Sequence, residues 1–304
     1  LAGSARPRHG HPTLPSVVAV LGAHAGSRRG TMKITLLGTG TPIPDPNRAG
    51  PAQLIESGDA KLLVDAGRGV VQRLAGAGVM PAFLSGVLIT HLHSDHISDL
   101  NDVITTIWVM AGDFMDLKVY GPEGIAAVVD STLAMLEADV SYRLAHHDDL
   151  NQSPKVTVTE VQPGDTFELA GLKVAVGATD HRPVHPTVAY RVDDGAASVV
   201  MAGDGIPCDT LDALCEGATA YCQAVLRDDL VKTIPVARIQ DILDYHSSVD
   251  QAAQTAARAG VQTLILTHYV PAPPLGEEEA FVAGAKAHFS GRVACGPDLT
   301  AVEI

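Results

Sequence analysis

Cysteine, aromatic residues and basic charge are all scarce in this chain of 304 residues. Its four cysteines, at positions 208, 215, 222 and 295, contain no C-x-x-C pair, which argues against a disulfide scaffold and favours a reducing compartment such as the cytoplasm. No hydrophobic run approaches the ~20 residues that a membrane-spanning helix needs. Because 46% of the residues are hydrophobic and 18% are charged, we expect a soluble globular protein with a large core and no membrane partner.

Basic residues are outnumbered, since 21 lysines and arginines face 35 aspartates and glutamates, for a net charge of −14. Four of the arginines precede Met32 in a stretch without acidic residues, so residues 32–304 carry −18. A body of this charge repels polyanions, and each phosphate contact of a nucleic acid normally requires a lysine or an arginine. The charge therefore argues against a nucleic-acid partner.

The first 31 residues differ from the rest in being rich in Arg, His, Pro, Gly and Ser. We interpret residues 1–31 as a disordered or artefactual leader and expect one domain over residues 32–304. The alternative is a secretory signal, which Arg6, Arg8 and an apolar stretch ending in Ala23-His24-Ala25 imitate weakly. In that case the protein would be secreted or periplasmic.

After Met32, short apolar runs alternate with turn signals and helical patterns, which predicts an α/β fold. The predicted strands cover 33–37, 52–57, 61–65, 86–90, 117–120, 156–160, 165–169, 172–178, 187–192, 198–202, 219–226, 262–267 and 299–303. The predicted helices cover 68–77, 97–111, 122–137, 208–216, 236–244, 248–259 and 276–289. The ends of the 248–259 helix are marked by a capping-box pattern, Ser248 and Gln251, and by Gly260.

Three imidazoles and a carboxylate follow the apolar strand 86–90 within six residues, as His91, His93, Asp95 and His96. Such a cluster repels itself when charged, unless a divalent metal ion holds it together. Neutral imidazole and carboxylate are ligands that zinc accepts without a thiol. Because positions i and i+2 can converge on one ion while i+4 and i+5 turn toward another, the spacing suggests two metal ions.

Three other strands are followed at once by a residue of ligand type, namely His181, Asp204 and His268. Binding groups of helix-covered sheets collect in crevices at strand ends, so we expect these residues to meet the 91–96 cluster in one cleft. The pooled set contains seven donors: His91, His93, Asp95, His96, His181, Asp204 and His268. Seven donors suit two divalent metal ions, expected to be zinc, with positions left open for water.

The chain resembles the metallo-β-lactamase superfamily and, within it, the ribonuclease Z and arylsulfatase-like branch. The matching segments are Leu37-Gly38-Thr39-Gly40-Thr41, Leu63-Val64-Asp65-Ala66-Gly67, the H-x-H-x-D-H run at 91–96, Asp180-His181, Ala189-Tyr190, Ala202-Gly203-Asp204, Tyr245-His246-Ser247-Ser248 and Leu266-Thr267-His268. The resemblance implies an α/β fold, a four-layer αββα sandwich in which helices flank two mixed β-sheets.

The resemblance also implies a role for each site residue. His91, His93 and His181 would bind the first metal ion, Asp95, His96 and His268 the second, and Asp204 would bridge them. A bridging hydroxide would be the nucleophile. Asp65 would orient a ligand, and His246 would act beside Asp95 in catalysis by protonating the leaving group or stabilising negative charge.

Several of these residues have plainer interpretations. His185 competes with His181, Asp204 could be a turn former between two glycines, and His246 could belong to a helix cap. Gly205 stands where this branch often has Thr, a departure that concerns a local hydrogen bond and not the ligand. For the remaining candidates we expect a solvated loop at 146–149, buried structural thiols at 208, 215 and 222, and core packing of Trp108, with pocket lining as its alternative.

The expected substrate class depends on a segment that this sequence lacks. Members of the resembled family that mature tRNA carry a long Gly- and Lys-rich arm between the equivalents of His181 and Asp204, whereas residues 190–202 here form a plain hairpin pattern. We therefore expect a small-molecule ester as the substrate, such as an aryl sulfate or a phosphodiester. The alternatives are tRNA 3′-end processing, lactone or β-lactam hydrolysis, and an inert scaffold of the same fold. The apolar faces of 103–110 and 125–136 are candidates for a homodimer interface.

Overall fold

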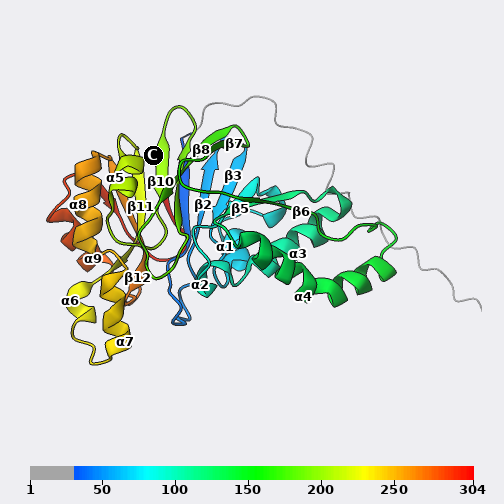
Figure 1. Ribbon diagram of the computed structural model, residues 1–304, viewed down its shortest axis with the longest axis horizontal. Helices are drawn as coiled ribbons and strands as arrows, with labels where there is room; N and C mark the ends of the chain where they lie inside the picture. The colour runs from blue at the N-terminus through cyan, green and yellow to red at the C-terminus, as the bar shows by residue number, and fades with distance from the viewer. Residues whose placement is uncertain (1–30) are drawn as a thin grey trace, which may run out of the picture.

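A computed structural model describes residues 31–304. The leader predicted over residues 1–31 lies, apart from its last residue, outside the described residues. The described chain folds into two seven-stranded sheets that pack face to face, with helices on both outer sides (Figure 1). This is the αββα sandwich that the resemblance implies, so the predicted fold class is confirmed.

The first sheet is antiparallel at one side and parallel at the other. In order across the sheet, its strands are β14 (Thr300–Glu303), β1 (Lys33–Gly38), β2 (Ala52–Ser57), β3 (Ala60–Val64), β4 (Gly86–Leu88), β5 (Leu117–Gly121) and β6 (Val156–Glu160).

The second sheet repeats this mixed pattern. In order across the sheet, its strands are β13 (Arg292–Ala294), β12 (Thr263–Val270), β11 (Ala220–Leu226), β10 (Ser198–Met201), β9 (Val188–Asp193), β8 (Leu172–Ala178) and β7 (Thr166–Leu169). Pairing between β11 and β12 shifts by one residue, because Ala224 faces Thr267 whereas Leu226 faces Val270. This β-bulge contains His268.

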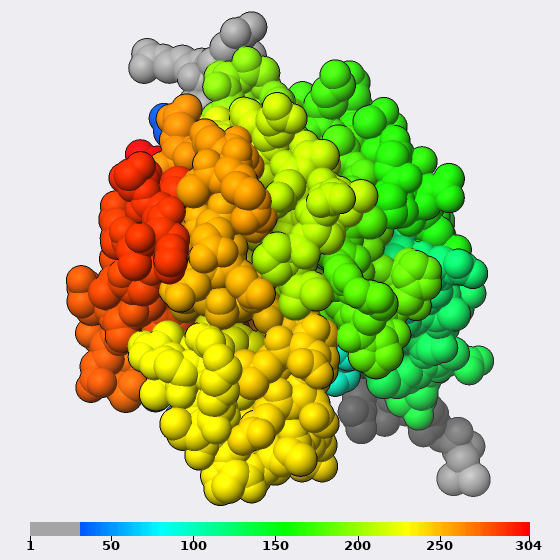
Figure 2. Space-filling model, turned by 60° about the vertical axis from the view of Figure 1, so that its left-hand side comes forward, coloured from blue at the N-terminus to red at the C-terminus, as the bar shows by residue number. Residues whose placement is uncertain are grey.

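Helices cover the outer face of each sheet (Figure 1). Beside the first sheet lie α1 (Val70–Gly76), α2 (Ser94–Ile97), α3 (Leu100–Ala111) and α4 (Ile125–His146), and beside the second lie α5 (Asp209–Cys215), α8 (Val249–Ala259) and α9 (Glu279–Lys286). The short helices α6 (Asp228–Val231) and α7 (Ala237–Gln240) form the yellow projection at the bottom of Figure 2. Single 3-10 turns occupy η2 (Pro81–Phe83), η3 (Gly112–Phe114) and η4 (Asp241–Asp244).

Three hydrophobic clusters hold these layers together. One lies between the sheets and includes Leu62 and Tyr190, and a second joins the first sheet to its helices around Trp108. The third joins the second sheet to α5, α8 and α9 around Ala253 and Phe281. Trp108 is 1% exposed, which confirms its predicted place in the core. Burial of this apolar surface is the main force that fixes the two sheets face to face.

Most predicted elements are present with shifted ends, and four differences matter. Helix α4 continues to His146 instead of ending at 137, so part of the loop predicted at 146–149 is helical. The helix predicted over 236–244 is α7 followed by η4, and β12 continues past His268 to Val270. Cys215 and Cys222 are buried as predicted, but Cys208 is only half-buried because it precedes α5 at the edge of its layer.

Within residues 31–304, no helix combines the length and the apolarity that crossing a bilayer requires. In the faces predicted to form a dimer interface, Val109 is 48% and Met135 is 64% exposed. The homodimer itself stays a prediction.

Candidate metal centre

Four of the seven predicted donors come from one turn of the first sheet. After β4 ends at Leu88, the chain passes through His91 and then through His93, whose backbone is extended, and begins α2 at Ser94. The short helix turns Asp95 and His96 inward, and both side chains are buried together with His91. His93 remains half-buried.

The other three donors come from separate places in the second sheet. His181 follows β8, Asp204 follows β10, and His268 lies within the β12 bulge. Asp204 occupies a turn in which Gly203 has φ 65° and Gly205 has φ 145°, values that favour glycine. Asp204 is therefore both the centre of a glycine turn and a buried carboxylate that faces the site.

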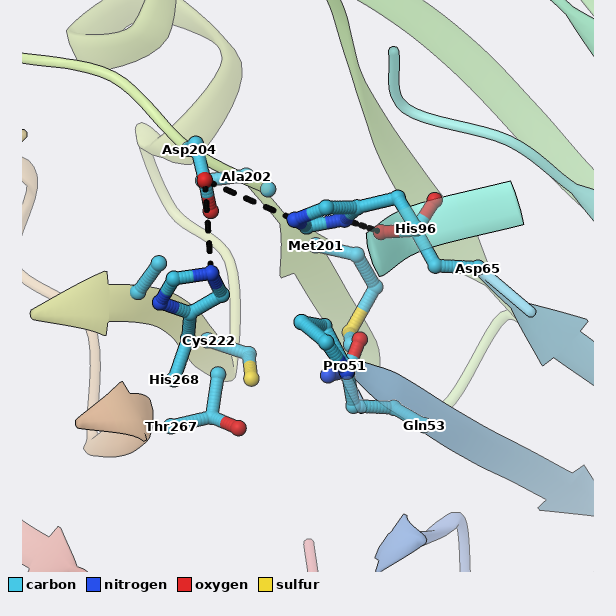
Figure 3. Close-up of a pocket in the computed structure, with 12 residues that line it drawn as sticks. Pro51, Gln53, Asp65, His96, Met201, Ala202, Asp204, Cys222, Thr267 and His268 are labelled. Atoms are coloured by element: carbon cyan, nitrogen blue, oxygen red, sulfur yellow. Dashed lines mark hydrogen bonds and ion pairs between the residues drawn. The ribbon is translucent and has the colours of Figure 1, made fainter. Parts of the chain in front are cut away.

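The seven side chains form two groups of potential metal ligands, in each of which one atom per residue lies within 4.8 Å of the others. The first donor group is His91, His93, His181 and Asp204, and the second donor group is Asp95, His96 and His268. Asp204 connects the groups, because its Oδ2 is 3.9 Å from Nε2 of His181 and 3.4 Å from Nε2 of His96. Figure 3 shows Asp204, His96 and His268 pointing toward one another.

Hydrogen bonds behind the imidazoles set their orientation. Asp65 Oδ2 is 2.8 Å from Nδ1 of His96, and the same carboxylate accepts a hydrogen bond from the Thr90 N–H. Nδ1 of His181 is 2.8 Å from the carbonyl oxygen of Tyr245. When Nδ1 donates, Nε2 is left free to accept a metal ion, so these partners favour the tautomer that a ligand requires.

The electrostatics of the site favour bound cations. Burial lowers the pKa of His91 well below its usual range and that of His181 to about 4, so both imidazoles are neutral near pH 7. Burial also opposes charge on Asp204, but the charges of His268 and His96 outweigh it and hold the pKa of this carboxyl well below its usual range. Neutral imidazole and ionised carboxylate are the forms that bind metal ions, so His91, His181 and Asp204 are already in the binding form. Burial opposes charge on His96 and His268, but the Asp204 carboxylate outweighs it and raises the pKa of both imidazoles, so a metal ion that binds them displaces a proton from each.

Unpartnered polar atoms supply a direct test of whether the residues fit metal ions. Among residues 31–304, Nε2 of His96 and Oδ1 of Asp204 are buried without a hydrogen-bond partner. Orphaned polar atoms are costly in a protein interior, and a cation placed between these two would satisfy both. The donor types are also those of a zinc-like ion, so the residues fit a pair of divalent cations.

A cavity of about 10 Å³ lies behind the second donor group (Figure 3). His96, Asp204 and His268 line one side of it, and Pro51 and Gln53 line the side that faces the first sheet. Its volume is close to that of one water molecule, so the ligands are supported from behind by close packing between the sheets.

His246 lies at the open side of the centre, just before α8. Its Nε2 is 3.2 Å from Oδ2 of Asp204, and its side chain is 11% exposed. The capping box predicted for Ser248 and Gln251 is present. His246 therefore lies next to the cap of α8 and also directs its ring at Asp204.

The structure brings together every residue that the sequence singled out for the site, including Asp65 and His246. His185, the competitor of His181, is exposed. The sequence indicated no role for Thr90, Tyr245 or Gln223. The side-chain amide of Gln223 donates to the Gly203 carbonyl oxygen at 3.0 Å. A buried glutamine in the central strand β11 is the one sequence signal that could have found this support for the Asp204 turn.

Comparisons with known proteins agree with this arrangement. A family model described as the beta-lactamase superfamily domain matches residues 60–269. A "Ribonuclease Z" of Mycobacterium avium is 54% identical over 275 residues, which cover 90% of this chain and 98% of the relative, and one of Mycobacterium tuberculosis is 50% identical over the same length.

Among solved structures, the metallo-beta-lactamase fold protein YhfI of Bacillus subtilis has a TM-score of 0.71 at 24% identity and covers 90% of this chain and 99% of its own. The short form of human tRNase Z has a TM-score of 0.66 at 21% identity and covers 89% of this chain and 98% of its own. At these identities the structures support the fold alone.

Fold and site together define a metal-dependent hydrolase. The chain belongs to the metallo-β-lactamase superfamily, in its ribonuclease Z branch.

The expectation of a small-molecule ester substrate and no nucleic-acid partner is wrong. Relatives named Ribonuclease Z match this chain over 98% of their own length, so an arm between His181 and Asp204 is no requirement for that name. The net charge misled for a physical reason, because a sum over the whole surface does not describe the potential at one cleft.

Proposed function

We propose that this protein is a ribonuclease Z that cleaves the 3′ trailer from tRNA precursors. One observation carries the proposal, namely the 54% identity to the M. avium Ribonuclease Z over nearly the full length of both chains. The centre suits the reaction, because phosphodiester hydrolysis requires a water nucleophile and stabilisation of charge on the phosphate oxygens.

We assign His91, His93 and His181 to a first zinc ion, Asp95, His96 and His268 to a second, and Asp204 to both. The convergence of Asp204 with each donor group supports this division. When bound, the two ions supply positive charge that polarises the phosphodiester and acidifies the attacking water. Asp65 holds His96 in its ligating orientation.

His246 is placed to protonate the leaving ribose oxygen. Its Nε2 faces the centre beside Asp204, and its Nδ1 lies 3.3 Å from the carbonyl oxygen of Ile242, which fixes the ring. General acids act over hydrogen-bond distances of this kind.

RNA contacts are available beside the centre in spite of the acidic body. Arg68 is exposed one residue after Gly67, which packs so closely on the Asp95 carbonyl oxygen that a Cβ would not fit there. The Tyr245 ring is half-buried, with its centroid 5.4 Å from that of His181. A guanidinium suits a backbone phosphate, and an aromatic face beside the reacting phosphate suits a stacked base.

Incubation of the zinc-loaded protein with a precursor tRNA that carries a 3′ trailer tests the proposal, with the products separated on a denaturing gel. We expect one cleavage at the end of the acceptor stem, lost on chelation of the metal ions. A protein that is folded, retains two metal ions and leaves the precursor intact would contradict the proposal.

Arg68→Ala sharpens this test. It should weaken precursor binding most at low salt and reduce the salt slope by about 1, since one phosphate contact is lost. Arg258→Ala is the matched control. Arg258 lies in the last turn of α8, away from the centre, and forms an ion pair with Asp212. Equal effects of both variants would show that RNA does not lie along Arg68.

A further inference from the structure

Arg48 is a buried cation outside the donor groups. Its guanidinium is fully buried and forms a 2.8 Å ion pair with Glu278, whose side chain is 9% exposed. Burying two charges is costly even when they are paired, so a pair like this is weak evidence for stability alone. The question is what the pair holds in place.

The contacts of Arg48 join two segments that are distant in the sequence. Nη1 donates to the Thr39 hydroxyl at 2.8 Å, just after β1, and Nη2 donates to the Pro273 carbonyl oxygen at 3.0 Å, just after β12. Its guanidinium carbon also lies 5.2 Å from the centroid of the Tyr269 ring. One planar side chain therefore connects the first sheet to the chain that leaves β12, a geometry that the flexible lysine cannot reproduce.

His268 directly precedes the segment that Arg48 contacts, which runs from Tyr269 to Pro273. Its backbone has φ 50°, an uncommon value for a residue other than glycine, and it belongs to the bulge between the Ala224–Thr267 and Leu226–Val270 pairs. Bulges redirect side chains, and strained backbone persists only where its surroundings fix it. Here the bulge directs the imidazole toward Asp204 (Figure 3), with Nε2 3.3 Å from Oδ2 of Asp95.

Tyr269, the residue after His268, is held by hydrogen bonds at its backbone and at its side-chain hydroxyl. The Tyr269 N–H donates to the Thr39 carbonyl oxygen at 3.1 Å, and the Tyr269 hydroxyl accepts from the Gly296 N–H at 3.0 Å. Thr39 is fixed in turn, because its N–H and hydroxyl both donate to Asp298 at 2.9 and 2.8 Å. Arg48 contacts Thr39 and Tyr269 together and so joins these supports.

We propose that Arg48 is a positioning residue for the second metal ion, which acts by holding the β12 bulge in the conformation that aims His268 at Asp95 and Asp204. The first donor group lies on other segments and does not depend on this contact. This inference rests on the metal assignment and goes beyond the proposed ribonuclease activity. It stands whether or not RNA is the substrate.

The test measures Zn²⁺ affinity site by site, by titration against a chromophoric chelator and by elemental analysis after dialysis. The main variant is Arg48→Met combined with Glu278→Met, because replacing both members of a buried pair usually preserves folding whereas removing one does not. We expect the first Zn²⁺ to bind as in the wild type and the second to bind about 10- to 100-fold more weakly, the usual effect of losing a ligand's support.

Three further variants serve as references, of which the first identifies the affected site. His268→Ala removes a donor of the second group directly, so its residual Co²⁺ absorption spectrum should match that of the double variant loaded with one Co²⁺. Arg48→Lys keeps the positive charge but loses the planar guanidinium with its several donors. It should therefore lower the affinity for the second ion by an intermediate amount. Arg258→Met is the control for loss of an arginine and should bind both ions normally.

The proposal is overturned if the folded double variant binds two Zn²⁺ with wild-type affinities. It is also overturned if the affinities for both ions fall equally, which would mean a general loss of structure. A wild-type protein that binds fewer than two Zn²⁺ overturns it as well. If the double variant does not fold, Arg48→Lys decides the matter, because wild-type affinity for the second ion in that variant would contradict the proposal.

Discussion

The two sheets contribute to the metal centre in different ways. The first supplies His91, His93, Asp95 and His96 from a single turn of six residues. The second supplies one donor from each of three segments, with 23 residues from His181 to Asp204 and 64 from Asp204 to His268. Local chain geometry can assemble the first set. The second set exists only when β8, β10 and β12 each pair with the strands between them, β9 and β11, in the correct register, because a shift by one residue turns every side chain of a strand to the other face.

The comparison also shows where the centre is vulnerable. A change in the first set removes a ligand from one ion, but Asp204 of the second set faces both donor groups. Substitutions in the two sets should therefore differ in how many metal ions they remove.

Asp204→Asn should have the largest effect. The amide keeps the size of the side chain but removes the charge that both groups share, so we expect fewer than one bound metal ion per chain and a loss of hydrolysis of about 10³-fold or more. His93→Ala is the matched variant of the first set and should lose only one ion. Elemental analysis and rate measurements check both variants, and equal metal loss would refute the asymmetry.

His246→Gln should slow cleavage of the RNA substrate by about 10²- to 10⁴-fold while both metal ions stay bound, since a general acid and not a ligand is removed. An activated nitrophenyl phosphodiester has a leaving group that needs little protonation, so its hydrolysis should be affected much less. A similar loss with both substrates would assign His246 to charge stabilisation instead.

Asp65→Asn should weaken metal binding or activity by about 10- to 100-fold, because the carboxylate no longer orients His96. The effect should fall on the second donor group alone, which a stepwise Zn²⁺ titration would detect. Thr90→Val serves as the contrast, because it removes a hydroxyl that contacts both Asp65 and Nδ1 of His91 and should therefore weaken both donor groups mildly.

The smallest effect concerns the thiols. Burial raises the pKa values of Cys215, Cys222 and Cys295 to about 12, so at pH 8 they are protonated and slow to react. Raising the pH from 8 to 9 should leave them slow, because thiolate forms only as the pH approaches the pKa. A thiol reagent should label the half-buried Cys208 in the native protein, and Cys208→Ser should abolish that labelling. Rapid labelling of Cys222 would indicate that the second sheet opens.

Much of the fold was predictable, because apolar runs and end signals mark most strands and the helix from Val249 to Ala259. The length of α4 was underestimated although it could be predicted, because Val140 and Leu144 continue the helical spacing of Leu136 and pack against the core. Residues 137–146 also contain neither Gly nor Pro, so nothing in them ends the helix before His146. By contrast, no local pattern placed a bulge at His268, because a bulge is a mismatch between two paired strands and is absent from either strand alone.

Local sequence is enough to specify the donor types, the turn from His91 to His96 and the glycines around Asp204, because each depends on neighbouring residues. Long-range contacts, by contrast, place Asp204 between both donor groups, Asp65 behind His96, and Arg48 against the segment that follows His268. These contacts join residues far apart in the chain, and only the packing of one sheet on the other brings them within hydrogen-bonding distance.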